Sequence, residues 1–338
     1  MYEKFFNLTG KPFQLTPDIR FLFMSPSHKR ALSYLYYGLK QGEGFVVITG
    51  DIGTGKTILI QNLLSEIADD IAAARVAVAN PDPDSVVAMV AAAFGLSYES
   101  KNKVSLLKDL ERFVLRCIQD GKRVLLVVDE AQTLTASALE ELRMLSNMEV
   151  NGRALMQIFL IGQTELRDTM AGRSMEQMRQ RVIATYQLSH LTLDETKSYI
   201  EHRLNAVGWS GDPALESEIF PSIHRWSEGI PRKINLLCDR LLLLGFLDEL
   251  HQITASHVET VVGEMDLEVV GQSSDDESNT PSISESKGAR KAVSGKRGSL
   301  DWRLRGLERR LTKIEAELEQ ERKRWRDAFE YIELNKSS

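Results

Sequence analysis

The sequence lacks any hydrophobic run long enough to cross a membrane. Its apolar stretches, among them residues 241–247, fall far below the ~18 residues that a bilayer span requires. Asp248 and Glu249 follow this stretch directly, so we expect a buried helix there. The N-terminus carries Glu3 and Lys4 among its aromatic residues and has no apolar region typical of a signal peptide. These features predict a cytoplasmic protein without an integral membrane span.

Cysteine is scarce, and positive charge is not in excess. The two cysteines, Cys117 and Cys238, lie far apart in apolar helical contexts and match neither a metal site nor a redox pair, so we expect buried thiols. The six histidines show no metal-ligand spacing, and no Ser–His–Asp or Cys–His arrangement is found. A net charge of −6 does not favour general electrostatic binding to nucleic acid or to an anionic membrane.

Five short runs of apolar or β-branched residues alternate with segments of helical character. Such runs are typical of parallel strands that are covered on both faces. The alternation with helices indicates βαβ units. The predicted strands are residues 45–49, 75–79, 124–128, 156–161 and 184–188. The sequence therefore predicts an α/β domain with a five-stranded parallel sheet over residues 45–190.

Helical signals replace the strand pattern from residue 191 onward. Thr192 and Glu195 form a capping box, which predicts a helix through Ala206. Further helices are expected near 214–228, broken around Pro221, and at 232–247 and 255–264, so that residues 191–270 form a small helical lid domain. The first 44 residues hold nine of the chain's aromatic residues, which predicts a segment packed on the core.

The C-terminal part has a different composition. Residues 271–300 contain eight Ser, four Gly and no aromatic residue, which predicts a disordered linker. In residues 301–338, Leu304, Leu307, Leu311, Ile314 and Leu318 follow the spacing of a coiled-coil seam. This stretch is predicted to form an amphipathic, coiled-coil-like helix, which either binds a partner or stays loosely ordered.

Residues 50–57 read Gly-Asp-Ile-Gly-Thr-Gly-Lys-Thr and match the phosphate-binding pattern G-x-x-x-x-G-K-[ST]. The motif follows one predicted strand and opens a predicted helix over 57–69, as a phosphate-binding loop requires. Glycines let backbone N–H groups turn toward phosphate oxygens, and a helix N-terminus favours negative charge. Lys56 is expected to reach the β- and γ-phosphates, and Thr57 to ligate Mg²⁺. The predicted nucleotide-binding residues are Gly50, Asp51, Ile52, Gly53, Thr54, Gly55, Lys56, Thr57 and Ile58.

A second motif ends the predicted strand 124–128. Two adjacent carboxylates, Asp129 and Glu130, follow it directly, and the carboxyl ends of parallel strands share one edge of a sheet. Asp129 is suited to hold Mg²⁺, and Glu130 is suited to orient and polarise an attacking water. No Asn-Lys-x-Asp guanine-reading motif is present, which favours ATP as the nucleotide.

These motifs carry a family resemblance. The phosphate-binding loop, the Asp129–Glu130 pair, the later strand end at Gln163 and the sequence Gly229-Ile-Pro-Arg232 resemble an AAA+ ATPase. Over residues 1–265 the chain is similar to the general secretion pathway protein A family, most of all to ATPases associated with exosortase and PEP-CTERM exopolysaccharide systems. The segments that carry this resemblance include Tyr2-Glu-Lys-Phe-Phe-Asn-Leu, Lys11-Pro-Phe-Gln-Leu-Thr-Pro-Asp18, Leu139-Glu-Glu-Leu-Arg-Met-Leu-Ser-Asn147 and Ile161-Gly-Gln-Thr-Glu-Leu166.

The resemblance implies further roles. Gln163 matches the sensor 1 position, where many AAA+ proteins have Asn, Ser or Thr, and Arg232 matches sensor 2, which contacts the γ-phosphate from the lid. Arg181, with Arg179 as second choice, lies where related ATPases place an arginine finger for the neighbouring subunit. These assignments imply a homo-oligomer formed through the ATPase domain.

The resemblance also implies a function. We expect hydrolysis of ATP, with Mg²⁺, to drive or switch assembly of a bacterial envelope secretion or exopolysaccharide export system. The expected client is an inner-membrane or envelope assembly protein, which could hold the chain at the inner membrane. The alternatives are a DNA-transposition or regulatory ATPase, disfavoured by the acidic charge, and an adaptor that binds ATP without hydrolysis, disfavoured by an intact Glu130.

Overall fold

The computed structural model describes residues 1–67, 70–77, 85–99, 101–150 and 153–273. The chain divides into two compact units. Among the described residues, the sheet unit consists of 12–206 and 223–236, and the helical unit consists of 1–11, 207–222 and 237–273. Most of the predicted linker and the whole coiled-coil-like tail lie outside the described residues. The predicted domain boundaries at residues 44, 190 and 270 stay predictions.

The sheet unit is built on five parallel strands in the order β2-β3-β6-β1-β7. This order confirms the predicted α/β class. It places β1, the first strand of the chain, between β6 and β7. The central strands are almost entirely buried, as their continuous apolar runs predict. The strand bounds are β1 (Phe45–Thr49), β2 (Ile71–Ala77), β3 (Arg123–Asp129), β6 (Gln157–Gly162) and β7 (Val182–Gln187).

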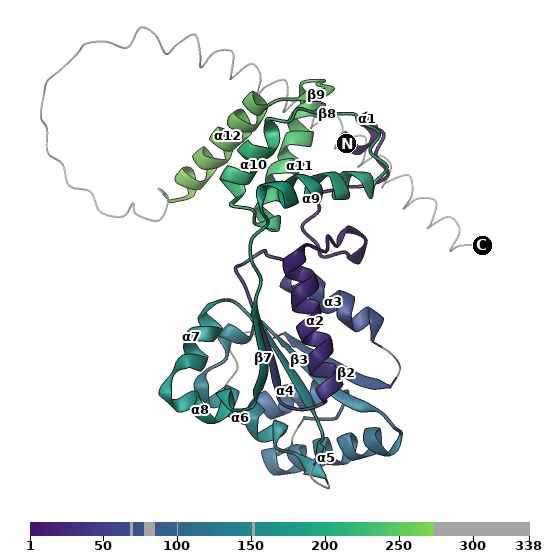
Figure 1. Ribbon diagram of the computed structural model, residues 1–338, viewed down its shortest axis with the longest axis vertical. Helices are drawn as coiled ribbons and strands as arrows, with labels where there is room; N and C mark the ends of the chain where they lie inside the picture. Colours follow the sequence, from purple (N-terminus) through teal and green to yellow (C-terminus); the bar gives the residue numbers. More distant parts are fainter. Residues whose placement is uncertain (68–69, 78–84, 100, 151–152, 274–338) are drawn as a thin grey trace, which may run out of the picture. The chain divides into compact units, whose positions relative to one another are not determined.

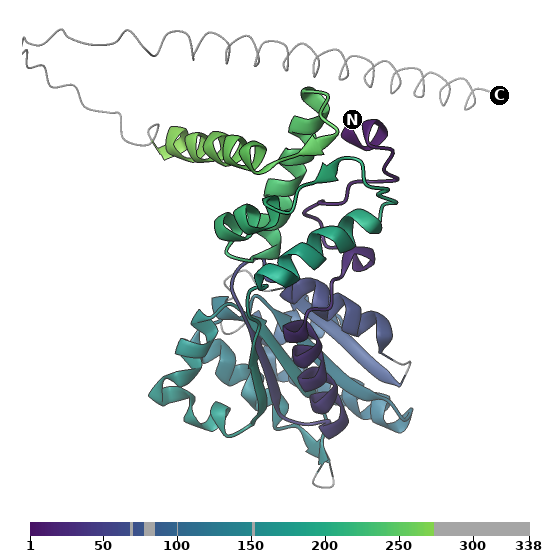
Figure 2. The same ribbon diagram turned by 45° about the horizontal axis from the view of Figure 1, so that its top comes forward.

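Helices cover both faces of this sheet, giving three layers (Figures 1 and 2). On one face, α2 (Pro26–Gln41) and α3 (Lys56–Glu66) bury apolar side chains such as Leu35 and Leu63 against the strands. On the other face, α4 (Val86–Ala93), α5 (Lys103–Gln119), α6 (Ala136–Ser146) and α7 (Glu165–Ala171) pack around residues such as Leu126. Each strand therefore contributes alternate side chains to two separate cores.

Short elements complete the sheet unit. They are η1 (Ile19–Phe21), η3 (Ala131–Thr133), η4 (Arg173–Met175), α8 (Glu176–Arg179), the antiparallel pair β4 (Glu149–Val150) and β5 (Arg153–Ala154), and α9 (Leu193–Asn205). Helix α9 begins with the predicted capping box, in which Thr192 and Glu195 each accept a backbone hydrogen bond from the other. The sequence signal for this helix start is confirmed.

The second strand differs from its prediction. It was expected at 75–79, but β2 begins four residues earlier, at Ile71, and the helix expected to reach residue 69 ends at Glu66. Residues 72–74 are all alanine, the strongest helix former and a weak strand former, so local propensity pointed away from a strand. Pairing with β3, from Ile71 opposite Arg123 to Ala77 opposite Asp129, decides the outcome. The other four strands lie within two residues of their predicted bounds.

The helical unit contains α1 (Tyr2–Phe5), α12 (Ala255–Ser273), and the short parallel pair β8 (Ala214–Leu215) and β9 (Gln252–Ile253). Helices α10 (Ile219–Ser227) and α11 (Pro231–Leu247) contribute residues to both units. The N-terminal segment packs into this unit, where the Phe5 ring stacks on His251 and contacts Phe246 edge to face. The Tyr2 hydroxyl donates to Asp239 over 2.5 Å.

Two helix predictions in this region need correction. The helix expected from residue 214 begins at Ile219, because Ala214 and Leu215 pair as a strand with β9. Pro221 does not break the helix, since it falls in the first turn, where a missing N–H costs nothing. Helix α12 extends to Ser273, three residues into the stretch predicted to be linker. Both cysteines are buried thiols, as expected.

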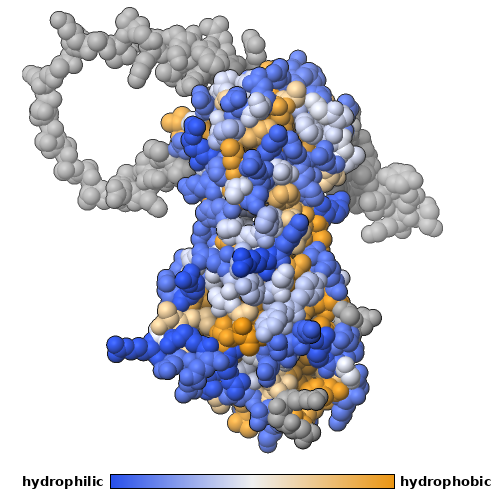
Figure 3. Space-filling model, viewed as in Figure 1, coloured by the Kyte–Doolittle hydropathy of each residue, from blue (hydrophilic) through white to orange (hydrophobic). Residues whose placement is uncertain are grey.

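The face of the described residues that Figure 3 shows is mainly polar. No helix among these residues is long and apolar enough to cross a membrane. On the face shown in Figure 3, hydrophilic side chains predominate, and separate hydrophobic areas interrupt them. Exposed apolar residues such as Met144 and Val150 are scattered over several elements. Single apolar residues at a protein surface are common and do not by themselves mark a binding site.

Helix α2 lies close to the sheet at Gly38. A Cβ atom there would lie 2.4 Å from Val46 Cγ2 and 3.0 Å from Phe159 Cε1. We predict that Gly38→Ala destabilises the protein by ~1–3 kcal/mol, the usual cost of overpacking a core. The matched control is Gly263→Ala in α12, where a Cβ meets no atom within 4 Å and helix propensity should raise stability by up to ~1 kcal/mol. Urea unfolding measures both effects, and a Gly38→Ala protein as stable as the parent would contradict the close approach.

Candidate functional site

The phosphate-binding motif forms a loop between β1 and α3. Gly53 and Gly55 adopt positive φ values of +85° and +96°, which only glycine adopts without strain, and α3 begins at Lys56. The buried Lys56 Nζ donates to the carbonyls of Gly50 (2.6 Å) and Asp51 (2.9 Å), so the ammonium lies across the mouth of the loop. Burial lowers the pKa of Lys56, and the nearby carboxylates of Glu130 and Asp129 partly oppose that effect.

The rest of the loop is held by its neighbours. Thr54 is buried, and its hydroxyl donates to the Asp51 carbonyl over 2.9 Å. The Asp51 carboxylate lies 2.6 Å from His190 Nε2, just beyond the end of β7. The side chain of Ile52, at the tip of the loop, is 59% exposed, whereas Ile58 on α3 is partly buried. All nine predicted nucleotide-binding residues therefore belong to one continuous loop and helix start.

Asp129 ends β3 beside this loop and is almost fully buried. Its Oδ2 accepts hydrogen bonds from Thr57 Oγ1 (3.3 Å) and from Arg75 Nη2 (2.5 Å). The two residues predicted to hold Mg²⁺ are thus neighbours. Sequence analysis placed residue 75 only at the start of the predicted strand 75–79 and missed the contact of Arg75 with Asp129, although a lone arginine in an apolar run was a signal for it.

A hydroxyl beside a carboxylate oxygen fits Mg²⁺. This ion prefers oxygen ligands and commonly takes one or two from the protein and the others from water and phosphates. Within the described residues, no cluster of three or more His, Cys, Asp or Glu side chains could hold a metal by itself. Thr57 and Asp129 therefore suit a metal that arrives together with a nucleotide, not a dedicated metal cage.

Glu130 follows with a left-handed backbone, at φ +55°. Its Oε2 accepts a hydrogen bond from Gln132 Nε2 (2.6 Å), while Gln132 Oε1 accepts one from the backbone N–H of Gln163 (2.9 Å). The Gln132 amide thus joins the predicted catalytic carboxylate to the predicted sensor position at the end of β6. Sequence analysis missed Gln132, although it lies only two residues after Glu130.

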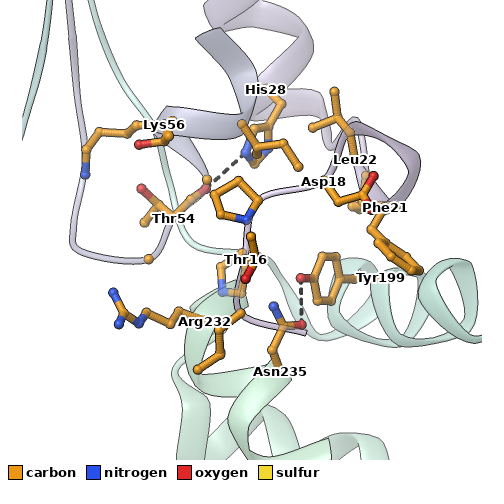
Figure 4. A pocket seen from close by; sticks show the side chains of 18 of the residues that line it. Thr16, Asp18, Phe21, Leu22, His28, Thr54, Lys56, Tyr199, Arg232 and Asn235 are labelled. Carbon is orange, nitrogen blue, oxygen red and sulfur yellow. Dashed lines mark hydrogen bonds between the residues drawn. The ribbon is translucent and has the colours of Figure 1, made fainter. Parts of the chain in front are cut away.

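These groups line one cavity of about 360 Å³ within the sheet unit. Lys56, Thr57, Glu130, Gln163 and Arg232 all line it. Figure 4 shows Lys56 and Arg232 toward one side of the cavity, and Phe21, Leu22 and Tyr199 toward the other. The second wall comes from residues 14–18 and 21–23, from α9 and from α11, and includes Leu15, Pro17, Phe21, Leu22, Phe23, Tyr199, Arg203 and Asn235.

Arg232 reaches the loop through its backbone. Its N–H donates to the Gly53 carbonyl over 3.2 Å, and a Cβ on Gly53 would lie only 2.4 Å from Arg232 Cβ. The Arg232 side chain is exposed and points into the cavity region with Lys56 (Figure 4). The start of α11 is therefore bonded to the phosphate-binding loop, and the sensor 2 assignment of Arg232 stays a prediction.

Arg179 and Arg181 do not line the cavity. Arg179 Nη1 donates to the carbonyls of Met170 (2.7 Å) and Gly172 (2.6 Å), and Arg181 Nη1 donates to the Ser146 carbonyl (3.0 Å). Arg181 precedes β7, and its own carbonyl accepts from Phe45 N–H at the start of β1. It therefore lies at the amino edge of the parallel sheet, while the phosphate-binding loop lies at the carboxyl edge. Neither arginine can serve the site of its own chain in this conformation.

His28 of α2 supports the loop from the side and was also missed by sequence analysis. Its Nε2 lies 3.0 Å from the Thr54 carbonyl and its Nδ1 lies 2.7 Å from Ser25 Oγ. A carbonyl only accepts, so Nε2 carries the proton and Nδ1 accepts from the serine hydroxyl. Burial lowers the pKa of His28, which favours this neutral form.

This buried imidazole predicts a pH dependence of stability. Because the pKa of His28 is lower in the folded state than its ordinary value of ~6.5, the unfolded chain takes up a proton first on acidification. The neutral imidazole therefore contributes to the free energy of unfolding. This contribution is full above pH ~6.5 and is lost as the pH falls toward the folded-state pKa. It amounts to ~1.4 kcal/mol for each unit by which the folded and unfolded pKa values of His28 differ. We expect His28→Gln, whose amide can still donate to Thr54, to lose less stability between pH 7 and 5 than the parent. Urea unfolding at several pH values tests this, and identical curves for both proteins would refute it.

Comparisons with known proteins agree with this geometry. Residues 39–170 match the family model described as an AAA domain. General secretion pathway protein A of Aeromonas hydrophila is 36% identical over 266 residues, which is 78% of this chain. The match covers 48% of that protein, so the chain spans about half its length.

Solved structures show the same fold at low sequence identity. The Aeropyrum pernix ORC1 protein in complex with DNA aligns with a TM-score of 0.57 at 17% identity, covering 78% of this chain and 71% of that one. Cdc6p from Pyrobaculum aerophilum aligns with a TM-score of 0.57 at 16% identity, covering 75% and 70%. The chain therefore has the fold of an AAA+ P-loop ATPase, and its predicted resemblance to general secretion pathway protein A is confirmed.

Proposed function

We propose that this chain binds ATP with Mg²⁺ in the cavity described above and hydrolyses it. One observation carries the proposal: Lys56, Glu130, Gln163 and Arg232, from four separate segments, line a single cavity beside the phosphate-binding loop. Two cations and a carboxylate suit a ligand that carries several negative charges and reacts with water. The AAA domain match over residues 39–170 supports the same reaction class.

Each polar group then has a role. The N–H groups of residues 53–57 and the start of α3 hold the phosphates, and Lys56 pairs with the β- and γ-phosphates once it exchanges its two carbonyl partners for phosphate oxygens. Thr57 and Asp129 would hold Mg²⁺, and the ion would supply positive charge beside the phosphates. Arg232 stabilises the γ-phosphate from α11.

Glu130 would orient the attacking water and accept its proton as the oxygen–phosphorus bond forms, while the bond from the γ-phosphorus to the bridging oxygen breaks and ADP leaves with the electron pair. The Gln132 amide restrains the carboxylate through the 2.6 Å hydrogen bond to Oε2, and its other end is bonded to the chain at Gln163. The Gln163 side chain lines the same cavity and is placed to contact the γ-phosphate. This arrangement supports turnover over the alternative of an adaptor that only binds ATP.

The arginine finger is proposed to act between subunits. Arg181, or Arg179 as second choice, lies at the opposite edge of the sheet from its own chain's loop, so it would have to enter the site of a neighbouring copy. There it would stabilise charge on the transferred phosphoryl group. This role implies a homo-oligomer assembled through the ATPase domain.

The biological setting is proposed from the relative. Similarity to general secretion pathway protein A supports a role in driving or switching assembly of a bacterial envelope system, and exopolysaccharide export is the specific system that we propose. The client would be an inner-membrane or envelope assembly protein, with this chain cytoplasmic and held at the membrane through that partner. The predicted coiled-coil-like helix at residues 301–338, which lies outside the described residues, would bind the client or a second copy.

A DNA-directed ATPase is the alternative. A protein of similar fold has been solved in complex with DNA, but at 17% identity the likeness concerns the fold alone. Residues 1–270 carry a net charge of −8, because the linker and the tail each contribute +1 to the total of −6. Acidic charge disfavours phosphate-backbone binding. Measuring the ATPase rate with and without duplex DNA separates the two functions, since stimulation by DNA would favour the alternative.

The first test separates binding from hydrolysis. Lys56→Ala should abolish tight ATP binding, because it removes the cation at the β- and γ-phosphates. Glu130→Gln should bind ATP normally and lose turnover by ~100-fold or more, since an amide cannot accept the proton of the attacking water. Fluorescent-nucleotide titration and phosphate release measure the two steps. Matched controls are Lys108→Ala and Glu99→Gln, which change exposed residues outside the cavity. Turnover at the parent rate in Glu130→Gln would contradict the assignment.

The second test addresses the finger. Arg181→Ala should retain ATP binding and lose hydrolysis. Mixed with Lys56→Ala subunits it should recover part of the activity, because some interfaces then pair an intact loop with an intact finger. Absence of recovery in verified mixed oligomers would exclude action across an interface. The same experiment with Arg179→Ala decides between the two arginines.

A further inference from the structure

A buried arginine stands at the second wall of the cavity. Arg203 of α9 is only 4% exposed, and the partners of its guanidinium among the described residues include no carboxylate. Its Nη1 donates to the Tyr199 hydroxyl over 2.8 Å and its Nη2 donates to the Gln14 carbonyl over 3.3 Å. Its guanidinium carbon also lies 4.8 Å from the centre of the Phe21 ring. A buried cation without a counterion is costly, so a use for its charge is expected.

The charge acts through a chain of hydrogen bonds whose direction is determined. A guanidinium only donates, so the Tyr199 oxygen accepts from Arg203. The hydroxyl proton is then available for Asn235, whose Oδ1 lies 2.8 Å away. This bond fixes which end of the Asn235 amide is the acceptor. A chain that starts at a cation polarises each following group, which strengthens the last donor.

That last donor is the amide nitrogen of Asn235. The residue is 7% exposed and lines the cavity, and its Nδ2 makes no hydrogen bond within the described part of the chain. Asn235 lies three residues after Arg232 on α11, so both project from the same side of the helix. Figure 4 shows Asn235 between Arg232 and Tyr199, facing the cavity across from His28 and Thr16. A donor is thus aimed at whatever occupies this part of the cavity.

The surroundings indicate which part of a nucleotide this is. Lys56 and the loop define the phosphate end, and Arg232 continues it along α11. Beyond Asn235 the wall becomes apolar and aromatic, with Phe21, Leu22 and Tyr199. Aromatic and apolar side chains suit the flat face of a base, while a ribose or a phosphate prefers polar partners.

We propose that Asn235 donates a hydrogen bond to a ring nitrogen of adenine, and that Tyr199 and Arg203 are positioning residues that hold its amide in the donating orientation. The proposal rests on the proposed ATP site and adds a base-reading residue to it. Adenine carries acceptor nitrogens at N1, N3 and N7, each of which can accept from an amide. The expected gain is that of one hydrogen bond in a shielded site, close to a tenfold change in affinity.

Binding of ATP to the full chain with Mg²⁺ tests the first part. Asn235→Ala and Asn235→Asp should each weaken ATP about 10-fold or more. The aspartate variant keeps the oxygen that accepts from Tyr199, so it covers the case in which alanine fails to fold. Asn205→Asp, at the exposed end of α9, is the matched control and should bind ATP as the parent does. Tyr199→Phe keeps the ring beside Phe23 but frees the amide to rotate, so a loss of a few-fold is expected.

Deaza analogues identify the acceptor. The 1-, 3- and 7-deaza forms of ATP each replace one ring nitrogen by carbon. The parent should bind one of these analogues about 10-fold more weakly than ATP, whereas Asn235→Ala should bind that analogue and ATP equally well. This pattern indicates a direct hydrogen bond between Asn235 and the replaced nitrogen. If no analogue shows this coupling, or if only 2′-deoxy-ATP does, then Asn235 does not read the base and the proposal is wrong.

The outcome also separates this inference from the proposed function. If the parent chain binds no ATP, the proposed function itself fails. If the parent binds ATP and folded Asn235 variants bind it equally well, only the base-reading role fails. Thermal melting of each variant establishes that it is folded before its affinity is compared.

Discussion

Parallel pairing of β1, β3 and β6 brings the candidate site together. Thr49 lies opposite Gly162, and β3 pairs with the other side of β6. In a parallel sheet all strands end at the same edge. The loop after β1, the carboxylates after β3 and Gln163 after β6 therefore lie close together, and the order of the strands alone determines this. A slip of one strand by a single residue would turn its side chains to the opposite face and separate these groups.

Charge within the site is balanced by short contacts. The buried Asp129 carboxylate has Arg75 and Thr57 as partners on one oxygen and the backbone N–H of Glu130 on the other. Lys56 is bonded to carbonyls, which relieves the cost of burying an ammonium. Because each buried charge already has a hydrogen-bond partner, ligand phosphates and a metal ion would exchange partners at these groups and would not need to create new ones.

Sequence analysis identified the parts of the site that are local in the chain. The phosphate-binding loop, the Asp129–Glu130 pair and the capping box at Thr192 each depend on residues a few positions apart, and the structure places them where the patterns indicated. The predicted start of β2 was wrong, because three alanines favour a helix and only their pairing with β3 makes them part of a strand. The contacts of His28 with Thr54, of Arg75 with Asp129, and of Tyr199 with Asn235 join residues far apart in sequence. Hydrophobic periodicity indicates which face of a helix is buried, but it does not indicate which residues that face contacts.

The contact between Gly53 and Arg232 has an evolutionary consequence. It is made by backbone atoms, because the N–H of residue 232 donates to the carbonyl of residue 53. The architecture therefore depends on a hydrogen atom as the side chain of residue 53, but not on which side chain residue 232 carries. A lineage could exchange the arginine for an uncharged residue and keep the docked helix. Selection would then act on the cation and on the scaffold separately.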